Sequence, residues 1–369
     1  MRRAARRSAG IALAVLAALA SSACADLGYY WQSANGHVGL LRAARPVSQW
    51  IDDPATGEAL RTRLELTQRI RRFAVDALAL PDNRSYTGYA DLHRNAAVWN
   101  VVAAPPYSLT LKTWCFPVAG CVGYRGYYAE ADARAEAAAQ AAQGLETAVY
   151  PVPTYSTLGW LDWAGGDPLL NTFIGYPEGE LARLIFHELS HQVVYVPGDT
   201  LFNESFATAV ERLGGMRWLT ERAGEPARAE YARFDARRRQ FRALTLATRR
   251  RLQAVYDTPA ARAGDAATVE PMKRAVMDAF RAEFATLRAT WPPERQAAYD
   301  GWIARANNAM LGAQAAYDTL VPAFEALFER EGRDWPRFYA EVRRIAALPA
   351  PERRAALPAL APTASAGAE

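Results

Sequence analysis

Two of the four histidines in this 369-residue chain stand four positions apart. They are His187 and His191 in the run His-Glu-Leu-Ser-His, and Glu188 directly follows the first of them. On an α-helix, a spacing of four residues places both imidazoles on one face, about one turn apart. This arrangement suits two ligands of a tetrahedral Zn²⁺, with a carboxylate beside them that can take a proton from an attacking water. The sequence therefore predicts one Zn²⁺ per chain and a general-base role for Glu188.

A catalytic zinc site needs a third protein ligand, and the next carboxylates along the chain are the candidates. Glu204 and Glu211 lie seven residues apart, nearly two helical turns, so one helix face carries both. One carboxylate can bind the metal while the other accepts a hydrogen bond from an imidazole N–H. Spacing alone leaves either residue open as the third ligand.

Two helices are expected to position these groups. Pro177 starts the first, which we expect to run to about Val196 and to end at Pro197-Gly198, and a second helix is expected from about Asn203. Short β-rich segments precede them at 97–103, 107–114, 122–128 and 147–152, and the chain after 216 has helical periodicity throughout. We therefore expect an α+β, predominantly helical fold, in which a small antiparallel sheet precedes the active-site helix pair and a helical C-terminal region.

The chain divides into four expected parts. Residues 1–23 are expected to be a signal, 24–175 an N-terminal α+β part with edge strands, and 176–349 the zinc-binding helices with a helical C-terminal part. Residues 350–369 are rich in Pro and Ala and are expected to be disordered.

The first residues predict that the protein is exported from the cytoplasm. Four arginines lie before an apolar run of ten residues, Ile11–Ala20, which is too short to span a bilayer, and Cys24 follows a small-residue stretch. We expect a lipoprotein signal with an acylated Cys24 as membrane anchor; a conventional secretory peptide is the alternative.

Without the four arginines of this segment the chain has 43 − 4 = 39 bases against 39 acids, so its charge gives no reason to expect a nucleic-acid partner.

The remaining cysteines, Cys115 and Cys121, flank the turn-forming run Phe-Pro-Val-Ala-Gly. In an oxidising compartment they can close a short loop as a disulfide; two buried thiols are the alternative.

The run HELSHQ, followed by NESFATAVE, resembles the gluzincin metallopeptidases, above all the aminopeptidase-N-like group. The resemblance implies that His187, His191 and Glu204 bind zinc, that Glu188 is the general base and that Glu211 orients a ligand. Only 13 positions separate His191 from Glu204, fewer than in those families, which keeps Glu211 as a rival ligand. The Gly-x-Met-Glu-Asn motif that binds the substrate amine in the aminopeptidase-N group is absent from this sequence.

A closer resemblance extends over nearly the whole chain. Cys24 with Ala-Asp-Leu-Gly-Tyr-Tyr, TWCFPVAGCVGYRGYY, YSTLGW with DPLLNTFI, and HELSHQ resemble the bacterial putative-aminopeptidase lipoprotein family. The resemblance implies a zinc-dependent peptidase that acts on peptides from the periplasmic face of the cell envelope, lipid-anchored at the outer membrane. It is also consistent with the Cys115–Cys121 disulfide. The alternative is a non-catalytic envelope lipoprotein with a structural zinc site or a peptide-binding role; protein partners stay undefined.

Four further residues are candidates for contact with substrate. Tyr317, near Asn308, is a candidate donor to the oxyanion, although an aromatic residue in a helical core is an alternative explanation. Ser156 and Gly159 precede the metal helix, where zincins place a substrate-binding edge strand, and simple packing is the alternative there.

Overall fold

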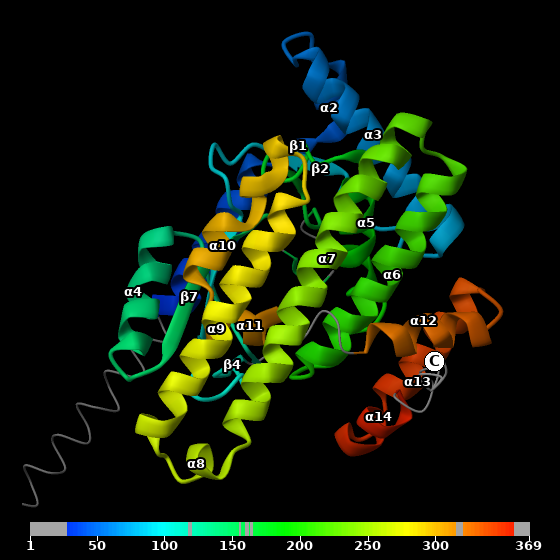
Figure 1. Cartoon of the computed structure of the whole chain (residues 1–369). Coiled ribbons are helices and arrows are strands. Elements are labelled where there is room, and N and C mark those ends of the chain that lie inside the picture. Colours follow the sequence, from blue (N-terminus) through cyan, green and yellow to red (C-terminus); the bar gives the residue numbers. More distant parts are fainter. Residues whose placement is uncertain are drawn as a thin grey trace, which may run out of the picture.

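The computed structural model describes residues 28–116, 120–154, 156–158, 162, 165–314 and 320–357 (Figure 1). Helices predominate and the strands are short, so the expected α+β, predominantly helical class is confirmed. Residues 28–43 are helical. The later helices are α2 Val47–Asp52, α3 Glu58–Leu78, α4 Glu130–Ala141, α5 Glu178–Ser190, α6 Thr200–Glu221, α7 Glu225–Tyr256, α8 Pro259–Arg262, α9 Ala266–Ala289, the 3₁₀ helix η2 Pro293–Tyr299, α10 Asp300–Arg305, α11 Asn308–Ala313, α12 Val321–Arg330, α13 Trp335–Ala346 and α14 Ala350–Ala356.

The strands form three small sheets among the described residues. Strand β3 pairs antiparallel with both β6 and β7, so β7 is an edge strand. A hairpin joins β4 and β5, and β2 lies between β1 and β8, its pairing with β8 being parallel. The strands are β1 Arg45–Pro46, β2 Gly88–Ala90, β3 Val98–Ala104, β4 Trp114–Phe116, β5 Gly120–Val122, β6 Arg125–Tyr127, β7 Glu146–Val152 and β8 Leu169–Leu170.

The main hydrophobic core combines elements from both sides of residue 175, the boundary expected between two parts. Phe73 of α3 packs against Phe186 of α5, and Phe206 of α6 packs against Phe324 of α12. A second core lies between α7, α9 and the segment around α10, with Phe280 at its centre. Figure 1 shows the long α7 and α9 beside the α5–α6 pair.

Two expected strands differ from the structure. The segment expected to be a strand at 107–114 contains no strand before Trp114, where β4 begins. The carbonyls of Pro105 and Pro106, just before this segment, accept hydrogen bonds from side chains instead of a neighbouring strand: Asn308 donates to both, and Lys273 also donates to the second. The segment 122–128 is not one strand either, since β5 ends at Val122 and β6 spans only Arg125–Tyr127. The expectation at 147–152 corresponds to β7.

The C-terminal stretch expected to be disordered begins with a helix. The side chain of Arg353 in α14 is buried and forms an ion pair with Asp199 at 2.8 Å, which fixes this helix to the N-terminus of α6. Residues 358–369 lie outside the described part. Among the described residues, no helix combines the length and apolar character needed to cross a membrane.

Candidate metal centre and cavity

Helix α5 presents His187 and Glu188 to a cavity, and His191 follows at its C-terminal cap. Leu181, Ile185, Phe186 and Leu189 are fully buried at 0% exposure, and this stripe anchors the helix in the core. His187 and Glu188 line the cavity. Burial of the apolar stripe therefore fixes the direction in which the side chains of His187 and Glu188 point.

A close antiparallel packing of α6 on α5 places Glu204 near the histidines. A Cβ at Gly215 would lie 2.6 Å from Cγ of Arg183, and one at Gly214 would lie 2.7 Å from a methyl carbon of Leu78. Glycine at these two positions thus allows the helices to approach. Close packing also holds Glu204 and Glu211 against the end of α5.

The turn between the helices is fixed by Asn203. Its amide accepts a hydrogen bond from the backbone N–H of Val196 and donates one to the carbonyl of the same residue, both at 2.8 Å. Helix α5 consequently ends at Ser190, six residues before the expected end, and Asp199 caps α6 by accepting from Phe202 N–H. His191 therefore lies at the C-terminal cap of α5 rather than within the helix.

His187, His191 and Glu204 form a group that can hold a metal ion. One ligand atom from each lies within 4.8 Å of the others. Nε2 of His187 lies 3.2 Å from Nε2 of His191 and 3.3 Å from Oε2 of Glu204. That carboxylate oxygen is buried without a properly directed hydrogen bond, and a buried unsatisfied oxygen is costly unless a cation or donor compensates it. The donor set fits a zinc ion.

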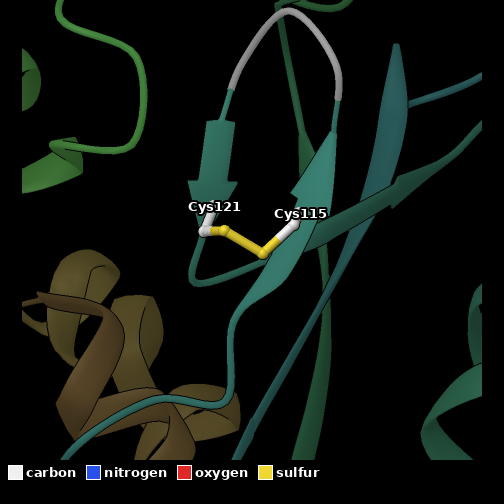
Figure 2. The surroundings of a disulfide bond; sticks show 2 residues. All are labelled: Cys115 and Cys121. Atoms are coloured by element: carbon white, nitrogen blue, oxygen red, sulfur yellow. A yellow bond between two sulfur atoms is a disulfide. The ribbon is translucent and has the colours of Figure 1, made fainter.

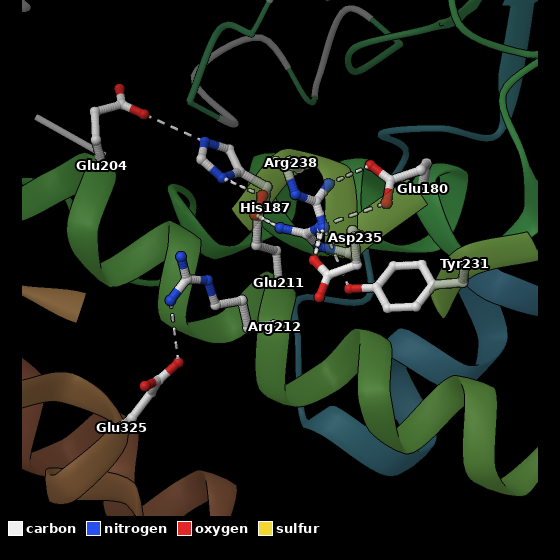
Figure 3. Close-up of polar contacts among 10 residues, drawn as sticks. Glu180, His187, Glu204, Glu211, Arg212, Tyr231, Asp235, Arg238 and Glu325 are labelled. Atoms are coloured by element: carbon white, nitrogen blue, oxygen red, sulfur yellow. Dashed lines mark hydrogen bonds and ion pairs between the residues drawn. The ribbon is translucent and has the colours of Figure 1, made fainter. Parts of the chain in front are cut away.

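Glu211 contacts the other nitrogen of His187. Its Oε2 lies 3.0 Å from Nδ1, and its Oε1 forms an ion pair with Arg183 (Figure 3). Burial opposes ionisation, but Arg183 and then His187 lower the pKa of Glu211 to about 2. The two carboxylates are thus separated by geometry: Glu204 faces Nε2 and the other histidine, whereas Glu211 holds the ring through Nδ1.

Glu188 lies at the cavity with one defined partner. Thr154, just after β7, donates a hydrogen bond of 2.9 Å to Oε1 of Glu188. Burial raises the pKa of this carboxyl to about 7, although His187 and Thr154 act in the opposite direction. A carboxylate whose pKa lies near neutrality is well matched to accepting and returning a proton.

A network of ion pairs lies next to Glu211 and supports the site (Figure 3). Arg183 also lies 3.4 Å from Glu180, which pairs in turn with Arg238 at 2.7 Å. Asp235 pairs with the same Arg238. The guanidinium carbon of Arg183 lies over the ring of Tyr231, 5.8 Å from its centroid. The buried Arg183 thus connects the metal helices to α7.

Sequence reasoning missed three tyrosines close to the site. Burial, followed by the negative charge of Glu204, raises the pKa of Tyr124 well above its ordinary value. Tyr150 and Tyr195 also have raised pKa values, chiefly through burial and with a contribution from Glu204. Tyr150 belongs to edge strand β7 and lines the cavity, and its place in the extended segment expected at 147–152 is the signal that could have found it.

The other sequence-predicted residues have varied locations. Ser156 Oγ lies 3.4 Å from Asp167, whose carboxylate also accepts from Thr157 N–H, and no described strand includes Ser156. Asn308 is fully buried, accepts from Tyr256 and donates to two backbone carbonyls, so its side chain is occupied by structural contacts. The candidates Tyr317, Gly159 and Cys24 lie outside the described residues.

Cys115 and Cys121 form a disulfide across the β4–β5 hairpin (Figure 2). The expected pairing is confirmed, and both residues are exposed rather than buried as thiols. The hairpin also contacts the turn between the metal helices: a Cβ at Gly120 would lie 2.4 Å from the backbone nitrogen of Gly198. The disulfide-linked hairpin therefore packs against that turn and stabilises it.

The fold and site define a predominantly helical α+β protein with a His–His–Glu group that can hold a metal ion and whose His187 lines a cavity. The chain belongs to the family described as "Putative aminopeptidase", whose model matches residues 28–357. This membership classes the protein as a peptidase. No match was found among the curated proteins, and none among the solved structures.

Proposed function

We propose that the protein is a zinc-dependent aminopeptidase of the gluzincin type. The observation that carries the proposal is the convergence of His187, His191 and Glu204 beside Glu188, with His187 and Glu188 lining a cavity of about 750 Å³. A cavity of this size accommodates a short peptide.

The donor set supports zinc as the metal. Two imidazole nitrogens and one carboxylate are a set found in catalytic zinc sites, which leave a fourth position for water or substrate. When bound, Zn²⁺ supplies Lewis-acid polarisation of a carbonyl and makes a water molecule acidic near neutral pH. His187 and His191 must be neutral at their ligating nitrogens. Burial lowers the pKa of His191 to about 4, which favours its neutral form. Burial opposes protonation of His187 as well, but the carboxylates of Glu204 and Glu211 raise its pKa, so metal binding must displace a proton there.

The protein's own groups then perform the proton transfers. Glu188 accepts the proton of the attacking water and delivers it to the departing amine nitrogen, while the hydrogen bond from Thr154 fixes its orientation. Glu211 accepts the N–H of His187 and holds that ring in place. We propose the phenol of Tyr150 as a donor to the oxyanion, because its side chain lines the cavity and the negative charge of Glu204 contributes to its raised pKa.

Edge strand β7 is the proposed substrate platform. It pairs only with β3 among the described strands, and the stretch from Tyr150 to Thr154 lines the cavity up to Glu188. An extended peptide can add to such an edge through main-chain hydrogen bonds, which brings its scissile bond toward Glu188. Recognition of this kind is tolerant of sequence.

We also propose that the enzyme works at the periplasmic face of the envelope, anchored through an acylated Cys24. Three features of the sequence support this location: the arginine-rich start, the ten-residue apolar run and the small residues before Cys24. The disulfide between Cys115 and Cys121 is in keeping with an oxidising compartment. Metabolic labelling with a radioactive fatty acid tests it, since Cys24→Ser should remove the label.

The experiment that tests the activity is digestion of matched peptide libraries with free and acetylated N-termini. The zinc-loaded protein should release N-terminal residues from the free set only, and Glu188→Gln should abolish the release while keeping the fold. Cleavage of both sets would indicate an endopeptidase instead. A zinc-replete wild type that cleaves neither set would favour a structural metal site.

A further inference from the structure

The cavity beside the metal group has an unusual balance of charge. Its described lining includes four arginines and three glutamates. All three glutamates have partners: Glu180 pairs with Arg183 and Arg238, Glu211 pairs with Arg183, and Glu188 accepts from a threonine. The carboxylates of the described lining are therefore engaged, and the two arginines that hold them belong to the supporting network.

Arg212 of α6 is a further arginine of the lining. It lies eight residues after Glu204 on α6, about 80° further round the helix and roughly 12 Å further along its axis. Its side chain is 29% exposed, and its ion pair with Glu325 of α12 is long at 3.6 Å. Figure 3 shows Arg212 directed away from the Glu180–Arg238 cluster. Its guanidinium has N–H groups to offer a ligand in the cavity.

Arg242 also lines the cavity, and it comes from helix α7. It lies one turn after Arg238 on α7, is half-buried, and lines the same cavity. Phe241 stacks on Tyr299 at 4.0 Å between ring centroids and meets Trp302 edge-on, and all three rings line the cavity. Aromatic walls exclude water, which strengthens a hydrogen-bonded pair between guanidinium and carboxylate.

We propose that Arg212 and Arg242 form an anion subsite that binds a carboxylate of the peptide substrate. The inference rests on the proposed peptidase function and names its substrate class: short peptides that carry a carboxylate a few residues from the scissile bond. The separation of roughly 12 Å along α6 corresponds to about three to four residues of extended chain. The carboxylate comes either from a free C-terminus or from an Asp or Glu side chain.

Kinetics on paired peptides test the subsite and identify the source of the carboxylate. Tetra-alanine is compared as the free acid and as the C-terminal amide, and amidated tetrapeptides with Glu or Gln at the last position form the second pair. We expect a KM roughly 10- to 100-fold lower for the charged member of at least one pair. Arg212→Gln and Arg242→Gln should each remove most of this preference with little change in kcat on the amide.

Matched variants separate a subsite from a general charge effect. Arg250→Gln removes an exposed positive charge from α7 and should leave the preference intact. Arg212→Lys should restore part of it, since it keeps the charge but loses the two-pronged geometry. Glu325→Gln should lower KM for the charged peptides, because it releases Arg212 from its competing partner.

Binding distinguishes failure of the subsite from failure of the proposed function. Calorimetric titration of the zinc-loaded Glu188→Gln protein with the acid and amide forms measures recognition without turnover. If the wild type cleaves no peptide, the proposed function fails, yet tighter binding of the acid still supports the subsite. Equal affinity for acid and amide, unchanged in folded Arg212→Gln and Arg242→Gln variants, overturns the proposal.

Discussion

Replacement of Glu211 by Gln should loosen the metal site and the fold at the same time. The carboxylate lies 3.0 Å from Nδ1 of His187 and forms an ion pair with Arg183, whose side chain is only 7% exposed. Glutamine keeps an oxygen that can accept from the histidine but loses the charge that neutralises the arginine. The substitution therefore separates orientation by a hydrogen bond from stabilisation by charge.

The expected magnitudes follow from these two contacts. Loss of a carboxylate that orients a metal-binding histidine typically lowers metal affinity 10- to 100-fold, and we expect about 10-fold because glutamine retains the acceptor. Removing one partner of a buried ion pair typically destabilises by about 3–5 kcal/mol. We expect about 3 kcal/mol, since Glu180 at 3.4 Å and Asp235 at 3.9 Å still face Arg183.

Two assays measure these effects independently of catalysis. Competition with a chromophoric chelator gives the zinc affinity, and urea unfolding of the metal-free protein gives the free energy of unfolding. Glu221→Gln on the same helix is the matched control, because its partner Arg217 is exposed and such pairs contribute about 0–1 kcal/mol. If Glu211→Gln matches this control in both assays, the reasoning about the supporting carboxylate is refuted.

Three further predictions concern the elements around the site. Asn203→Ala removes the amide that bonds both backbone groups of Val196, so the free energy of unfolding should fall by about 2–4 kcal/mol in urea titration; no change would contradict the role of this amide. Gly120→Ala should destabilise by more than Gly144→Ala, although both glycines have positive φ, because only the first closely approaches another backbone; equal losses in the same assay would contradict it. Burial raises the pKa of Glu180 to about 7, so the native state retains a proton that the unfolded state releases near 4.5, and this residue makes stability fall as pH rises from about 4.5 to 7. Glu180→Gln should flatten that fall in unfolding experiments across this range, whereas an identical slope would show that the group titrates normally.

The residues that carry the chemistry could be found from the sequence because their spacing is local. Four positions between His187 and His191, and seven between Glu204 and Glu211, translate directly into positions on a helix face. Likewise, a separation of six positions across a turn-forming run was enough to predict the disulfide. Helical periodicity and β-branched segments also gave the fold class and the extended stretch that is strand β7.

Long-range contacts explain what the sequence did not show. The end of α5 depends on Asn203, which lies beyond the turn, and the order of α14 depends on an ion pair between Arg353 and Asp199, 154 residues apart. Thr154 reaches Glu188 across 34 residues, and its hydroxyl has no sequence pattern that marks it. The arginines of the cavity wall were likewise hidden among the many arginines of the exposed helices.

The most direct test of the central claim is a zinc titration of the metal-free enzyme, followed by hydrolysis of a peptide with a free N-terminus. The account predicts activity that rises with added Zn²⁺ and saturates at one ion per chain, and no activity at any zinc concentration for Glu188→Gln. Hydrolysis that does not depend on zinc, or that persists at the wild-type rate in Glu188→Gln, would contradict it.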